Sequence, residues 1–212
     1  MFIFELVGRE DHPVYQRLLV ENLERQYSFL RSAVIASLEM GRPLLSLEVI
    51  LSLNYHAISC LHGNAGLLRP CKVTVGDYEP PPHFEVPALM AMFVDEVNRN
   101  WERADPVVLA SYVLWRLNHI HPFINGNGRT ARVACYFVLC CKIGEWLGGD
   151  VLLPELLRQN RDEYVAALKA VDAGLPKVEL APLHSLISRL LGEQMASAEA
   201  AAQQPPPPPA GG

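Results

Sequence analysis

The sequence predicts an all-α helical bundle with one small β-hairpin. Apolar residues recur at helical spacing along most of the chain, and capping residues, glycines and prolines divide these segments. Only residues 72–76 have a clear strand character. A chain of 212 residues, half of them apolar, can bury one sizeable core, and bulk disorder is excluded.

Two helices are expected in the first third of the chain. Residues 14–40 carry a drifting apolar face and should form a long helix, which residues 41–43 (Gly-Arg-Pro) would end. Residues 45–61 form the second predicted helix, because Ser46 and Glu48 provide capping chemistry at its start.

The predicted hairpin begins with three β-branched residues, Val73, Thr74 and Val75, and turns at Gly76. Two strands alone are marginally stable, so this hairpin should lean on helices and keep one edge open. Three prolines at 80–82 then force an extended passage.

Two helices should follow. Pro87 fits the first turn of a helix in which an apolar residue recurs every fourth position: Leu89, Phe93, Val97 and Trp101. Asp105 is a suitable N-cap, and Pro106 a suitable first residue, for a helix that leads to His121.

The last part of the chain should also be helical. The predicted helices are an apolar one over 129–144, one carrying Tyr164 that ends at Gly174, and a last one over 179–202. Residues 203–212 contain five consecutive prolines and should be extended or disordered.

The stretch 121–132 carries the chemistry. His121 can take a proton from a hydroxyl near neutral pH. Gly126, Asn127 and Gly128 can form a nest of N–H groups at the start of a helix, which suits an anion. Arg129 and Arg132 follow at i and i+3 and suit phosphate. The stretch therefore predicts a polyphosphate beside a general base.

These twelve residues resemble the signature of the Fic family, HPFx[D/E]GNGRxxR, and depart from it only at Asn125. Residues 66–90 are similar to the family's β-hairpin flap and following helix, and residues 160–168 are similar to its NRxxYxxAL helix. The resemblance implies four parts: an N-terminal helical extension (1–44), a Fic core (45–175), a C-terminal helix (176–202) and a disordered tail (203–212).

The resemblance implies a protein adenylyltransferase, with His121 as the general base. AMP would pass from ATP to a Ser, Thr or Tyr hydroxyl of a target protein. The glycine–arginine stretch would cradle the phosphates, and Tyr164 would lie on the nucleoside side. The open edge of Val73, Thr74, Val75 and Gly76 would pair with the target's backbone.

Asn125 stands where the family has an acidic residue that helps to hold Mg²⁺. Asn keeps a carbonyl oxygen but loses the charge that Mg²⁺ prefers. We therefore expect a weak Mg²⁺ site at Asn125, with most of the metal's affinity coming from ATP.

The sequence lacks the [S/T]xxxE[G/N] pattern by which family members inhibit themselves, so the chain should be unrestrained or held by a separate, antitoxin-like partner. The alternatives are another nucleotide donor, phosphate transfer as in Doc toxins, or a lapsed Fic module that only binds a protein. A metal site built from His119 and His121 with His56 or His62 is a weaker alternative, because no Asp, Glu or Cys completes zinc-like spacing.

Composition narrows the partners and the compartment. A net charge of −5 argues against non-specific nucleic-acid binding. The longest apolar run, residues 133–141, is too short to span a membrane. Five cysteines without zinc spacing suggest a reducing cytoplasm. Export by a specialised secretion system would leave no mark of this kind.

Overall fold

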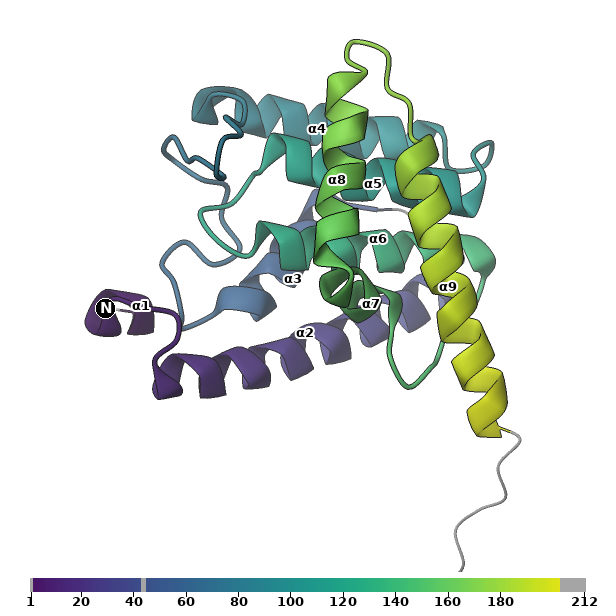
Figure 1. The fold of residues 1–212 in the computed structure, drawn as a ribbon, viewed down its shortest axis with the longest axis horizontal. Coiled ribbons are helices and arrows are strands. Elements are labelled where there is room, and N and C mark those ends of the chain that lie inside the picture. Colours follow the sequence, from purple (N-terminus) through teal and green to yellow (C-terminus); the bar gives the residue numbers. More distant parts are fainter. Residues whose placement is uncertain (1, 43–44, 203–212) are drawn as a thin grey trace, which may run out of the picture.

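A computed structural model describes residues 2–42 and 45–202, and within them it contains helices and no β-strand (Figure 1). None of the described helices combines the length and the hydropathy needed to cross a bilayer. The α-helices are α1 (Ile3–Val7), α2 (Pro13–Glu39), α3 (Leu47–Ile58), α4 (Val86–Arg99), α5 (Pro106–Ile120), α6 (Asn127–Ile143), α7 (Leu153–Gln159), α8 (Arg161–Ala173) and α9 (Ala181–Ala202), with a 3₁₀ turn at His83–Glu85.

Helix α6 is the central element of the bundle. Its apolar run from Val133 to Cys141 is buried on every side, because several helices pack around it. Helices α2 and α3 pack on α6 and on each other, α5 runs against it, and α8 and α9 cross in front (Figure 1). A helix buried all round needs no polar face, which explains its weak amphipathicity in the sequence.

The predicted helices are confirmed to within a few residues at their ends. The side chain of Asp105 caps α5 by accepting from the N–H groups of Val107 and Val108, at 2.8 and 3.2 Å. Ser46 accepts from the N–H of Val49 at 3.2 Å and caps α3. Two short helices, α1 and α7, were not predicted. The helix α2 ends at Glu39, and Gly41 follows in the left-handed region with a φ of 60°, as the predicted stop requires. Pro43 and the predicted tail, residues 203–212, lie outside the described residues.

The predicted β-hairpin is replaced by a single turn. Val75 and Tyr78 exchange two backbone hydrogen bonds of 3.0 Å, and this isolated bridge is the extent of strand pairing in the described residues. The Tyr78 hydroxyl donates to the backbone oxygen of His119 on α5, at 2.7 Å. Because this contact holds the returning chain against the bundle, no second strand runs back along Val73. We call residues 75–78 the flap turn.

Candidate active site

His121 ends helix α5 in an unusual backbone conformation. Its φ of 50° and ψ of 60° lie in the left-handed region, and its N–H donates to the oxygen of Leu117 at 3.0 Å. Non-glycine residues seldom adopt this conformation, although His does so more readily than most. The turn places the ring in the lining of a cavity between α5, α6, α8 and the flap turn.

The loop after His121 is closed by the side chain of Asn127. Its amide donates to the oxygen of Phe123 at 2.8 Å and accepts from the N–H of Phe123 at 2.9 Å. The Asn127 side chain therefore shapes the loop and is not free for phosphate. The N–H groups of Asn127, Gly128 and Arg129 have no acceptor among the described residues, as expected for the first turn of a helix.

The cavity has a volume of about 420 Å³ and brings together part of the predicted site. Its lining includes five of the expected residues: His121, Gly128, Arg132, Tyr164 and Val75. It does not include the other expected residues, which are Val73, Thr74, Gly76, Asn125, Gly126, Asn127 and Arg129. The base and one of the two motif arginines thus share one cavity.

Three further cations line this cavity and were missed in the sequence. Arg161 and Lys169 join Arg132 without an ion pair to a described residue, whereas Arg158 is paired with Glu155; the one carboxylate in the lining is that of Asp172. The cavity is therefore locally positive in a chain of net charge −5, and it suits a polyphosphate. A signal was available, because the α8 residues of the lining recur at helical spacing and form one face: Arg161, Val165, Leu168, Lys169 and Asp172.

The two motif arginines face different neighbours. Arg129 donates to the oxygen of Ala57 at the end of α3, at 2.9 Å, and to the side-chain oxygen of Asn125, at 3.0 Å. Burial lowers the pKa of Arg129 from its usual value. Arg132 makes no hydrogen bond or ion pair of standard geometry with a described residue, and it lines the cavity. Arg132 is thus the motif arginine available to an anion.

Burial also sets the protonation of His121 and Tyr164. It lowers the pKa of His121 to about 4, with a further decrease from the nearby Arg69 cation, while the Asn118 carbonyl opposes the shift. His121 is therefore neutral at pH 7 and able to accept a proton. The Tyr164 hydroxyl accepts from Asn118 at 2.7 Å, and burial raises the pKa of Tyr164 to about 12, so it stays neutral.

The flap turn is fixed to the cavity wall by a line of hydrogen bonds. The Tyr78 hydroxyl lies 3.1 Å from Nδ1 of His119, which lies 2.9 Å from the carboxylate of Asp172. That carboxylate also accepts from the indole N–H of Trp115 at 2.9 Å. The flap turn, α5 and α8 are thereby joined.

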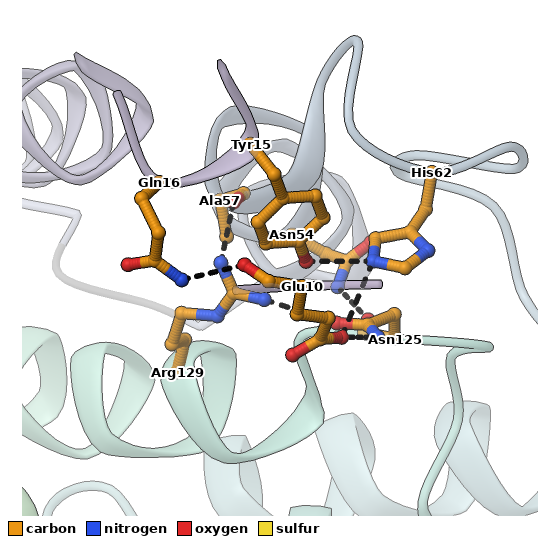
Figure 2. Close-up of polar contacts among 8 residues, drawn as sticks. All are labelled: Glu10, Tyr15, Gln16, Asn54, Ala57, His62, Asn125 and Arg129. Carbon is orange, nitrogen blue, oxygen red and sulfur yellow. Dashed lines mark hydrogen bonds and ion pairs between the residues drawn. The ribbon is translucent and has the colours of Figure 1, made fainter. Parts of the chain in front are cut away.

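Asn125 does not fit the metal site expected there. Its side-chain oxygen accepts from the Arg129 guanidinium, and its amide nitrogen donates to Glu10 at 3.2 Å (Figure 2). A divalent cation on this oxygen would share it with a fixed positive charge. The alternative histidine site also lacks support, since the described residues contain no group of three or more His, Cys, Asp or Glu able to hold a metal.

Comparisons with known proteins agree with this geometry. Residues 44–139 match the Fic/DOC family. Two relatives named protein adenylyltransferase Fic, from Drosophila willistoni and Drosophila persimilis, are 34% identical over 110 residues, or 51% of this chain. These matches cover 21% and 20% of the relatives, so the chain spans about a fifth of their length.

Solved structures show the same fold. A Fic-1 structure from C. elegans aligns over 94% of this chain and 57% of its own, with a TM-score of 0.72 and 20% identity. A Fic domain containing signaling protein from Bacteroides thetaiotaomicron aligns over 96% of this chain and 80% of its own, with a TM-score of 0.73 and 21% identity. This chain contains a Fic domain, which the family match places at residues 44–139.

Proposed function

We propose that this chain is a protein adenylyltransferase that transfers AMP from ATP to a Ser, Thr or Tyr hydroxyl of a target protein. The observation that carries the proposal is the shared cavity: neutral His121 lines it together with Arg132 and the first turn of α6. The names of the Drosophila relatives support the same activity.

The residues divide the reaction between them. His121 accepts the proton of the target hydroxyl, whose oxygen forms a bond to the α-phosphorus of ATP. The bond from that phosphorus to the bridging oxygen breaks, and pyrophosphate leaves. The N–H groups of α6 and the guanidinium of Arg132 stabilise the charge on the phosphates, and Tyr164 flanks the nucleoside. Mg²⁺ belongs to the proposal only as the ion that ATP carries in solution.

The target would enter beside the flap turn. Val73 and Thr74, just before it, make no backbone hydrogen bond with described residues, so their N–H and C=O groups can pair with an extended segment of the target. This pairing would bring a hydroxyl of the target to His121. Because it uses backbone groups, it would depend little on the target's amino-acid sequence. We therefore propose that Val73, Thr74, Val75 and Gly76 bind the backbone of the target protein.

We also propose that a separate inhibitory, antitoxin-like partner controls the activity. Within the described residues no carboxylate lies within ion-pairing distance of Arg132, so a carboxylate of a separate partner could pair with this arginine. We further propose that the chain is divided into the four parts given above, residues 1–44, 45–175, 176–202 and 203–212, and that it acts in the cytoplasm.

The test is transfer of label from α-³²P-ATP to lysate proteins. The unmodified chain should label them, and His121→Ala should lose about 10²–10⁴-fold in rate. His184→Ala on α9 is the matched control, since it removes a histidine away from the cavity and should label normally. Label from γ-³²P-ATP instead would indicate phosphate transfer, and equal labelling by His121→Ala would contradict the proposed base.

The second candidate is a lapsed Fic module that only binds a protein. It is favoured by the hydrogen bond that Arg129 donates to Asn125, which takes one motif arginine away from the cavity. Absence of label with ATP, CTP and UTP, combined with capture of a partner that is lost on changing Val73 and Thr74, would favour this candidate.

A further inference from the structure

Two segments far apart in the sequence meet at Asn125. Glu10 precedes α2, Asn125 lies in the loop before α6, and Arg129 is in the first turn of α6 (Figure 2). The Asn125 amide nitrogen donates to Glu10 Oε1 at 3.2 Å, and its oxygen accepts from Arg129 Nη2 at 3.0 Å. Asn125 thus forms a bridge between a carboxylate and a guanidinium.

Only one orientation of the Asn125 amide fits this bridge. A guanidinium carries donors and no acceptor, whereas an ionised carboxylate carries acceptors and no donor. Turning the amide over would set its N–H₂ group against Arg129 and its oxygen against Glu10, and both hydrogen bonds would be lost. The position therefore needs a side chain that offers one donor and one acceptor, as Asn does.

Glu10 is held where it meets Asn125. Gln16 donates to the backbone oxygen of Glu10 at 2.6 Å. The carboxylate of Glu10 also lies 3.6 Å from Nε2 of His62, and that nitrogen is 2.8 Å from the hydroxyl of Tyr15. Tyr15 is 1% exposed, so the segment that carries Glu10 is anchored in the core. Figure 2 shows these side chains converging above the start of α6.

Arg129 is fixed from the other side by the oxygen of Ala57. Its guanidinium therefore joins three elements: α6, the end of α3 and, through Asn125, the segment that carries Glu10. The turn that Arg129 stiffens includes Gly128, which lines the cavity beside Arg132.

We propose that Asn125 is a positioning residue, matched to Glu10, that holds Arg129 and the first turn of α6 in place, and that it is not a metal ligand. Glu10 is its partner in this role. The role in catalysis rests on the proposed function, because only that function makes the first turn of α6 a phosphate site. The bridge itself rests on the contacts alone.

If Asn125 were a weakened metal ligand, restoring the family's acidic residue with Asn125→Asp would improve the site. The proposal predicts instead that this change lowers the stability of the fold. Asn125→Asp leaves acceptors only: one oxygen keeps the contact with Arg129, now as an ion pair, and the second faces Glu10 at hydrogen-bond distance. A hydrogen bond to a charged group is replaced by a like-charge contact, although Glu10 is half-exposed and can turn partly away. In a chain of 212 residues we expect Tm to fall by about 3–6 °C.

A double-mutant cycle tests the match. Glu10→Gln supplies a donor, so the variant Glu10→Gln with Asn125→Asp restores one donor facing one acceptor. We expect it to recover at least half of the loss in Tm, whereas Glu10→Gln alone should change Tm little. Asp11→Asn is the control, because it removes the neighbouring carboxylate, whose one ion pair among the described residues is with Arg9 at 3.4 Å on the surface. It should not rescue Asn125→Asp. The proposal would be overturned if Asn125→Asp changed Tm by the same amount in the Glu10→Gln and Asp11→Asn backgrounds.

Binding of a fluorescent ATP analogue tests the metal. We expect Asn125→Ala to leave the MgCl₂ concentration for half-maximal binding unchanged, within about twofold, whereas loss of a metal ligand would raise it about tenfold or more. A tenfold rise in this MgCl₂ concentration would refute the proposal that Asn125 is not a metal ligand. If neither chain binds the analogue, the proposed function fails, and the melting cycle still decides whether Asn125 and Glu10 are matched.

Discussion

Arg69 holds both ends of residues 71–81, which contain the flap turn and which we call the flap segment, to the loop that carries the base, and we expect its replacement to release both. The backbone N–H of Arg69 donates to the oxygen of Pro122 at 2.8 Å. Its guanidinium donates to the oxygens of His121 at 2.8 Å and Cys71 at 3.0 Å, and also to that of Pro81. The residue is 3% exposed, so these carbonyls have little water to replace it.

The cost of Arg69→Lys follows from these contacts. An ammonium group cannot span three carbonyls set in a fan, so about two of the three side-chain hydrogen bonds are lost. Each lost partner of a charged donor costs about 1–2 kcal/mol net, which gives about 2–4 kcal/mol in total. For a chain of this length that is a fall in Tm of about 5–15 °C.

Differential scanning fluorimetry measures this fall, and limited proteolysis between residues 72 and 80 reports whether the flap segment is released. Arg189→Lys is the matched control, because Arg189 pairs only with the exposed side chains of Glu163 and Glu193 and its change should leave Tm unaltered. An Arg69→Lys chain that melts with the parent and resists protease equally would refute the reasoning.

Three other predictions concern the motif itself. Gly126→Ala should lower the free energy of unfolding in urea by about 2–4 kcal/mol, because Gly126 has a φ of 78° and an added Cβ would lie 2.8 Å from a side-chain carbon of α3. Gly148→Ala is the control: its added Cβ meets nothing within 4 Å, so the free energy of unfolding should change little. Arg132→Lys should weaken ATP binding without changing Tm, whereas Arg129→Lys should lower Tm; a reversed pattern would exchange their assigned roles. The folded chain keeps His121 neutral down to about pH 4, whereas a His in the unfolded chain protonates near pH 6.5. Acidification therefore favours the unfolded chain. The contribution of His121 to stability is full above about pH 6.5 and is lost as the pH falls towards 4. The parent should therefore lose about 1–2 kcal/mol more than His121→Asn between pH 7.5 and pH 5, and parallel losses would contradict the burial of the ring.

The sequence predicted the helices because their signals are local. Asp105 and Ser46 cap the helices that follow them, within three residues of the N–H groups they accept from. The hairpin was over-predicted because β-branched residues favour an extended chain without fixing a partner strand. The short helices α1 and α7 were not predicted, because five and seven residues are too few to show a clear helical periodicity.

The site was predicted in its residues and only partly in its geometry. Arg129 and Arg132 lie on one helix face, as their spacing requires, yet three residues correspond to a rotation of about 60° around the axis. On a helix packed on all sides, that rotation is enough to direct one guanidinium to α3 and the other to the cavity. The partner of Asn125 could not be predicted, because Glu10 is 115 positions away and no local pattern relates them.

The hydrogen bond between Trp115 and Asp172 gives this protein an intrinsic optical probe. The Trp115 indole is 2% exposed, lies 5.1 Å from the His119 ring and lines the cavity where we place ATP. Indole emission depends on the polar groups around the ring and shifts when its N–H loses a carboxylate acceptor. A ligand that draws His119 or Asp172 towards itself therefore changes the fluorescence of Trp115, and occupancy of the cavity can be followed without a label.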